Sequence, residues 1–183
     1  MRKETIMTST KRLVLTALCT ALCIVLPMAF HTIPNGGKIM LPMHIPVLLC
    51  GMICGAPYGM VCGALGPMLS SILTGMPVAA MMPAMMVECA AYGLVSGLAL
   101  RRIRTGKIYA DLYLALLTAM LVGRLVSGVT KALIFQAGQY TLAAWISASF
   151  VTALPGIALQ LALLPSVVYY LMKAKLIPSR YDA

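Results

Sequence analysis

The sequence predicts an all-α integral membrane protein, a compact bundle of six transmembrane helices with both termini in the cytoplasm. Of its 183 residues, 61% are hydrophobic and only 10% are charged, and the mean hydropathy is +0.95. Soluble domains carry about 25% charged residues, because a folded surface needs them to stay hydrated. Apolar runs long enough to cross a bilayer recur along the chain, and basic residues cluster beside them. This composition excludes a water-soluble domain.

The first three helices are expected at 11–30, 44–56 and 57–74. The first run follows basic residues, as in a signal peptide. It is longer than a signal-peptide core and lacks a small-residue cleavage site, so we expect a retained helix. The loop at 31–43 contains Pro-Asn-Gly-Gly, which is typical of turns because Asn and Gly tolerate positive φ. The second helix is short for a span, and almost no loop separates it from the third.

The remaining three helices are expected at 84–100, 109–137 and 142–172. The apolar segment Gly75–Pro83 is expected to dip back rather than form a free surface loop. The basic loop Arg101–Lys107 separates the fourth helix from the fifth. Pro155 and Pro165 should kink the sixth helix, because each removes a backbone hydrogen bond and clashes with the preceding turn. No internal repeat is found, so residues 1–183 are expected to form a single transmembrane domain.

The basic residues predict the orientation of the bundle. With six spans, eleven Lys and Arg residues lie on one side and only Lys38 on the other. By the positive-inside rule, the basic side is cytoplasmic. Their position beside apolar spans also argues against a nucleic-acid partner. The eleven residues are Arg2, Lys3, Lys11, Arg12, Arg101, Arg102, Arg104, Lys107, Lys173, Lys175 and Arg180.

Three ionisable residues lie well inside the predicted spans, namely Glu88, Arg124 and Lys131. Each costs very roughly 2.5–3.5 kcal/mol at a helix centre, so each must face a partner or a wet cavity. Arg124 and Lys131 share one face of the fifth helix, which Ser127 and Gly128 continue.

The fourth and sixth helices add polar groups, because Tyr92 follows Glu88 at i+4 and Gln160 lies in the sixth helix. The functional interpretation is an externally open pocket for a small polar solute. Two cations against one anion favour a solute that carries a carboxylate. The alternative is a buried Glu88–Arg124 pair that only fixes helix packing, with Lys131 extending to the lipid headgroups.

No catalytic or metal-binding motif is found. His31 and His44 bracket the first external loop without a third ligand nearby, so they are expected to bond solvent or solute. The sequence has no H-E-x-x-H, P-loop, G-x-S-x-G or redox C-x-x-C. The chain is therefore not expected to be an enzyme. The six cysteines all lie in apolar segments and are expected to be buried small side chains.

Ala17 and Ala21 form a small-x-x-x-small pair in the first helix, a spacing that lets two helices approach closely. With this pair, six short spans and cytoplasmic termini, the chain resembles the substrate-binding (S) components of energy-coupling factor (ECF) transporters. The stretch Leu41–Gly75, LPMHIPVLLCGMICGAPYGMVCGALGPMLSSILTG, looks like the family's second and third helices. There, I-P-V-L-L-x-G leads into a helix rich in G-x-x-x-G. The resemblance covers most of the chain.

The resemblance implies a high-affinity vitamin-binding subunit in the prokaryotic plasma membrane. It would join a transmembrane coupling subunit, on which Ala17 and Ala21 would dock, and two cytoplasmic ATPases. Those ATPases would use the ATP, and this chain would hold no cofactor. Members bind solute near the external face, through the first loop, the loop after the third helix, and helices four to six. By position, the candidate substrate-binding residues are Asn35, Lys38, Glu88, Tyr92, Arg124, Lys131 and Gln160.

The resemblance does not name the solute. Pantothenate or another carboxylate vitamin fits two cations against one anion, while a cobalamin or a neutral precursor stays open. A stand-alone secondary transporter is the alternative. It would use Glu88 for proton coupling and would need no ATPase partner.

Overall fold

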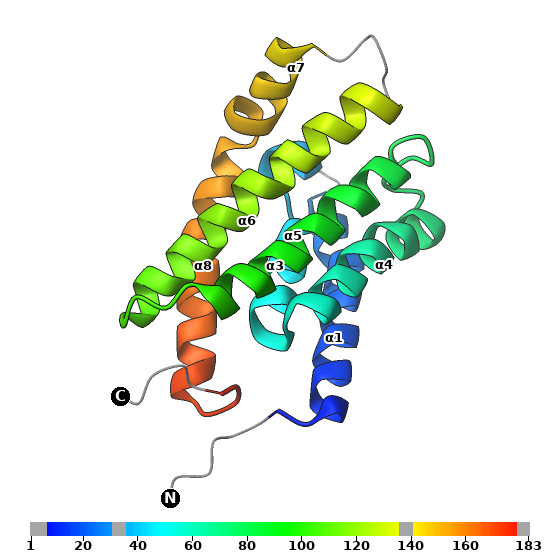
Figure 1. Ribbon diagram of the computed structural model, residues 1–183. Coiled ribbons are helices and arrows are strands. Elements are labelled where there is room, and N and C mark those ends of the chain that lie inside the picture. Colours follow the sequence, from blue (N-terminus) through cyan, green and yellow to red (C-terminus); the bar gives the residue numbers. More distant parts are fainter. Residues whose placement is uncertain (1–6, 31–35, 136–140, 179–183) are drawn as a thin grey trace, which may run out of the picture.

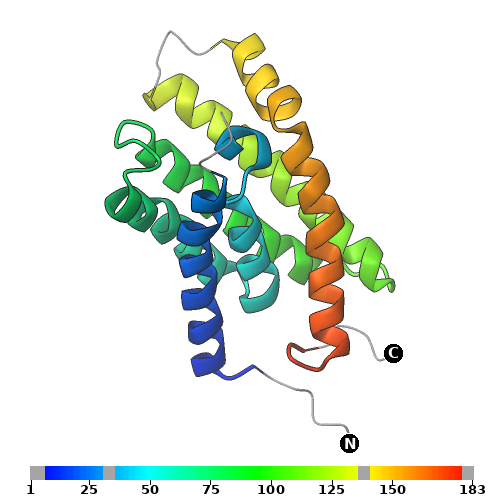
Figure 2. The same cartoon turned by 180° about the vertical axis from the view of Figure 1, so that it is seen from behind.

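The computed structural model describes residues 7–30, 36–135 and 141–178, and every regular element in these ranges is helical. Figure 1 shows the bundle and Figure 2 its reverse side. Two π-helical segments continue α6 and α7. The elements are α1 (Ser9–Ala29), α2 (Gly36–Met40), α3 (His44–Cys54), α4 (Ala56–Thr74), α5 (Met82–Arg102), α6 (Ile108–Thr130), η1 (Lys131–Phe135), α7 (Leu142–Ile146), η2 (Ser147–Thr152) and α8 (Leu154–Lys173).

Five helical segments are long and apolar enough to cross a membrane, namely α1, α4, α5, α6 with part of η1, and α8. The prediction of a helical integral membrane protein is confirmed at this level. The sixth expected span rests on α3, which has 11 residues and is about 17 Å long at 1.5 Å per residue. That is roughly half of a 30 Å hydrocarbon core. Nine of its residues are buried, so α3 is a short helix enclosed by protein.

Helix α5 occupies the centre of the bundle, where it contacts α3, α4 and α6. Small residues bring α4 and α5 together. A Cβ on Gly59 would overlap the carbonyl of Gly93, and one on Gly63 would overlap the carbonyl of Cys89. The two backbones are therefore in direct contact, as small residues permit between membrane helices. All six cysteines are buried and free, as expected.

Three loops and breaks differ in detail from the expectation. The first loop contains the short helix α2, which packs against α8 where a Cβ on Gly156 would lie 2.7 Å from the Ile39 carbonyl oxygen. The loop after α4 is bound to that helix, since the Ser70 hydroxyl donates to the Met76 carbonyl. Most of its side chains are nevertheless exposed. The last helix breaks at Ala153, two residues before Pro155, which lies in the first turn of α8.

The bundle has two distinct ends (Figures 1 and 2). The lower end in Figure 1 carries the start of α1, the turn between α3 and α4, the loop between α5 and α6, and the end of α8; we call it the basic end. The upper end carries α2, the loop after α4, and α7; we call it the site end.

Candidate functional site

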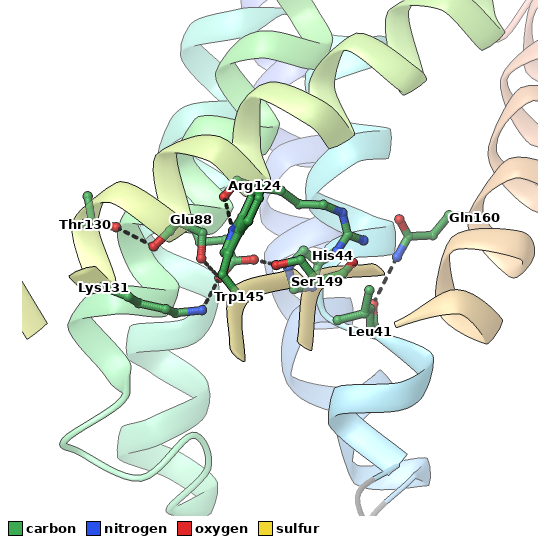
Figure 3. A network of polar contacts seen from close by, with 10 residues as sticks. Leu41, His44, Glu88, Arg124, Thr130, Lys131, Trp145, Ser149 and Gln160 are labelled. Atoms are coloured by element: carbon green, nitrogen blue, oxygen red, sulfur yellow. Dashed lines mark hydrogen bonds and ion pairs between the residues drawn. The ribbon is translucent and has the colours of Figure 1, made fainter. Parts of the chain in front are cut away.

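Glu88 is the centre of a polar cluster between α3, α5 and α6 near the site end (Figure 3). The Ser127 hydroxyl donates a hydrogen bond of 2.6 Å to Glu88 Oε2. Lys131 Nζ lies 3.1 Å from the same oxygen. His44 Nε2 lies 3.6 Å from Glu88 Oε1. With the Glu88 side chain only 14% exposed, this carboxylate is held in an apolar bundle by three polar neighbours.

Glu88 forms its ion pair with Lys131. The alternative interpretation of the sequence, a buried Glu88–Arg124 pair that fixes helix packing, is therefore wrong. Ser127 on α6 and Lys131 at the start of η1 are one turn apart and lie level with Glu88 on α5, while Arg124 lies nearly one turn deeper on α6. The Lys131 side chain is 23% exposed and reaches Glu88. The idea that Lys131 extends to the headgroups is therefore wrong for this structure.

Arg124 is a buried cation without a carboxylate partner among the residues that the structure describes. It is 5% exposed. Its Nη1 donates to the Ser149 carbonyl oxygen, and its guanidinium carbon lies 5.6 Å from the centre of the Phe150 ring. Both partners belong to η2. They provide a carbonyl dipole and an aromatic face, which satisfy the guanidinium only in part.

Trp145 of α7 covers this part of α6. Its indole Nε1 donates a 3.1 Å hydrogen bond to the Arg124 carbonyl oxygen. The ring fits because residue 128 is glycine, where a Cβ would lie 2.5 Å from that nitrogen. Trp145 also lines a cavity of about 320 Å³ between α6 and α7, whose other walls include Leu125 and Val129.

His44 and Tyr92 have polar atoms beside Glu88 that make no hydrogen bond. His44 begins α3 and is 6% exposed, and its ring meets the Tyr92 ring edge-on with centroids 4.9 Å apart. Neither His44 nitrogen nor the Tyr92 hydroxyl has a hydrogen-bond partner. A buried polar group without a partner costs about 1–3 kcal/mol, so His44 Nδ1 and the Tyr92 hydroxyl are available to a bound solute or water. Gly123 makes room for the tyrosine ring, which a Cβ there would approach to 2.7 Å.

The other predicted residues contribute unequally. Gln160 is buried, and its Nε2 lies 3.5 Å from the Leu41 carbonyl oxygen. Leu41 has a φ of 49°, in the left-handed region that non-glycine residues rarely adopt. Asn35 lies outside the described residues. Lys38 belongs to α2, and its side chain is also outside the description.

Sequence reasoning missed several groups of this site. His44 was expected to be a loop histidine that bonds solvent or solute, and it is instead the buried first residue of α3. Trp145, Ser149 and Phe150 were not considered, although Trp145 is the only tryptophan in the chain. Within the described ranges, no group of three His, Cys, Asp or Glu side chains is placed to hold a metal ion.

The fold and the site together define an integral membrane protein that keeps charged and polar side chains inside an apolar bundle. Intramembrane groups of this kind mark solute or ion sites. Residues 11–168 match the family model for the ECF transporter, substrate-specific component. Because the match covers most of the chain, the protein belongs to this family. No curated protein matches the chain closely enough to count as a relative.

Membership in this family establishes the location and the general role of the protein. It is a multi-pass protein of the cell membrane and the substrate-binding component of an ECF importer. The family is one of transporter components and not of enzymes. Membership in the family implies a small-molecule substrate and association with a membrane-embedded coupling unit and ATPases.

Proposed function

We propose that this chain captures a water-soluble vitamin or precursor with a carboxylate, pantothenate being the leading candidate, at the external face of the membrane. The supporting observation is Arg124, which is 5% exposed and has no acidic partner among the described residues. An unpaired buried charge is expensive. A carboxylate is the natural complement of a guanidinium, because two parallel hydrogen bonds can form between them.

The neighbouring groups suit the same solute. Glu88 already has Lys131 as its cation and Ser127 as a hydrogen-bond donor, so Arg124 is the cation left for the ligand. His44 Nδ1 and the Tyr92 hydroxyl, which make no hydrogen bond, would bond hydroxyl or amide groups elsewhere on the solute. Titration of the purified chain with pantothenate, beside its uncharged alcohol analogue, tests whether the site selects the carboxylate.

The site would face outward if the basic end is cytoplasmic, as the split of eleven to one in basic residues favours. In a cysteine-free background, cysteines are introduced at two exposed positions, Ala80 near the site end and Lys107 at the basic end. An impermeant thiol reagent added to whole cells is expected to label Ala80→Cys. Labelling of Lys107→Cys should require permeabilised cells. The reverse pattern would refute both the orientation and an external site.

Import would require docking on a coupling subunit and ATP hydrolysis by two partner ATPases, with no cofactor in this chain. Ala17 and Ala21 are both exposed on α1, which leaves this small-residue face open for a partner helix. The double variant Ala17→Leu with Ala21→Leu is expected to abolish uptake in cells that express the coupling subunit and ATPases. Solute affinity of the isolated chain should stay within about twofold, because both alanines are exposed on α1, which supplies no residue to the Glu88 cluster.

The matched control is Ala158→Leu with Ala162→Leu, a pair of exposed alanines with the same spacing on α8. This control should import normally. Normal uptake in the α1 variant would show that its small-residue face is not the coupling surface. Uptake by the chain without any ATPase would instead favour a stand-alone proton-coupled transporter.

A further inference from the structure

A second cavity, of about 610 Å³, opens at the basic end, opposite to the Glu88 cluster. It lies between the first turn of α1, the α3–α4 turn, the end of α5 and the chain that follows α8. Figures 1 and 2 show these segments gathered at the lower end of the bundle. Three arginines line the cavity, namely Arg12, Arg101 and Arg104.

These three arginines have no acidic partner among the residues that the structure describes. The ion pairs found there belong to Glu88. Arg12 Nε is in addition buried without any hydrogen-bond partner. Ala56 and Pro57, at the start of α4, also line the cavity, and a helix start adds partial positive charge. Three cations around one hollow repel each other unless an anion joins them.

The remaining walls are apolar. Met52, Leu98, Leu100, Met172 and Ile177 line the same cavity. Leu98 is also 42% exposed, and it belongs to a helix long and apolar enough to cross a membrane. The cavity therefore has a cluster of cations beside a hydrophobic wall. This combination suits an amphiphile, which has a charged headgroup and an apolar chain, better than a fully hydrated ion.

We propose that this cavity binds a phosphate group, and that the phosphate is carried by an anionic phospholipid. Guanidinium groups bind phosphate oxygens through paired hydrogen bonds. Basic pockets between membrane helices on the cytoplasmic side are the usual binding places of anionic lipid headgroups. The acyl chains would lie along the apolar wall near Leu98 and leave the bundle there. The inference is independent of the vitamin proposal, because no residue of the Glu88 cluster lines this cavity.

The test compares three additions to the purified, delipidated chain in a neutral detergent: phosphatidylglycerol, phosphatidylcholine and inorganic phosphate. Native mass spectrometry counts retained lipid, and a melting curve reports stabilisation. Phosphatidylglycerol is expected to stay bound and to raise the melting temperature, while the other two additions do neither. The affinity of the double variant Arg101→Gln with Arg104→Gln for phosphatidylglycerol should be lower by about tenfold or more. Both positions are exposed, so their replacement should not disturb folding.

Arg102→Gln is the matched control, because Arg102 is an equally exposed arginine on the same turn of α5 that does not line the cavity. It should bind phosphatidylglycerol like the unmodified chain. An equal loss in this control would reduce the effect to general surface charge and overturn the proposal. Equal stabilisation by inorganic phosphate would overturn the lipid assignment. Failure to retain phosphatidylglycerol would overturn the site itself, whatever the result for vitamin binding.

Discussion

Arg124→Gln is expected to weaken binding of a carboxylate vitamin by about a hundredfold or more, or roughly 2.7 kcal/mol. Glutamine keeps a hydrogen-bond donor at similar reach but removes the charge. The solute carboxylate then loses a charge-assisted pair that is shielded from water. Isothermal titration with carboxylate vitamins such as pantothenate and biotin measures the loss. The uncharged alcohol analogue of each vitamin, which cannot use the charge, should bind both proteins alike.

The melting temperature separates this effect from misfolding. Removing one half of a buried ion pair costs about 3–5 kcal/mol because it leaves the other charge unpaired. Arg124 has no such partner among the described residues, so its neutralisation should leave the melting temperature unchanged or raise it. Arg124→Lys, which keeps the charge but loses the planar fork, should bind with intermediate affinity. Lys131 is a less suitable position for this test, because its removal would leave the Glu88 carboxylate without its ion-pair partner.

Two results would contradict the proposal. If Arg124→Gln binds the carboxylate vitamin as tightly as the unmodified chain, the buried guanidinium serves packing against Phe150 and η2 only. If no carboxylate vitamin binds the unmodified chain while a neutral solute does, the charge argument fails. Membership in the substrate-binding family would still stand.

The sequence predicted the helices well because a bilayer imposes a simple rule of length and apolarity. The expected range 57–74, for example, corresponds to α4 at Ala56–Thr74. Glu88, Arg124 and Lys131 were found because the cost of burying a charge makes it conspicuous in an apolar run. The short helix α2 was missed, since five residues between turn signals carry no detectable periodicity.

Pairing inside the site could not be predicted from one sequence. Whether Glu88 meets Arg124 or Lys131 depends on the rotation and depth of α5 relative to α6, and a difference of one turn moves the contact by about 5.4 Å. The same limit applies to His44, whose burial depends on how α3 is enclosed by α1, α4 and α5. Trp145 reaches Arg124 only because α7 and η2 lie against α6.

The contact between α4 and α5 fixes the depth of Glu88, and it can be tested with one methyl group. Gly63→Ala is expected to lower the free energy of unfolding by about 2 kcal/mol or more. The added Cβ would overlap the carbonyl of Cys89 and lie 2.7 Å from the Ala90 nitrogen. Backbone atoms cannot rotate away as a side chain can, so the two helices must separate. Cys89 directly follows Glu88, so the separation should also displace the carboxylate and weaken solute binding.

The sign of this effect is informative, because alanine is intrinsically favoured over glycine in a helix by about 1 kcal/mol. Without the close contact, Gly63→Ala would therefore stabilise the protein. Gly37→Ala in α2 is the control, since a Cβ there meets no atom within 4 Å. It should leave the melting temperature unchanged or slightly raised. A melting curve in detergent, followed by the fluorescence of Trp145, compares the two variants. A Gly63→Ala protein that melts at or above the temperature of the unmodified chain would show that α4 and α5 are farther apart. Glu88 would then owe its depth to its partners on α6 rather than to this contact.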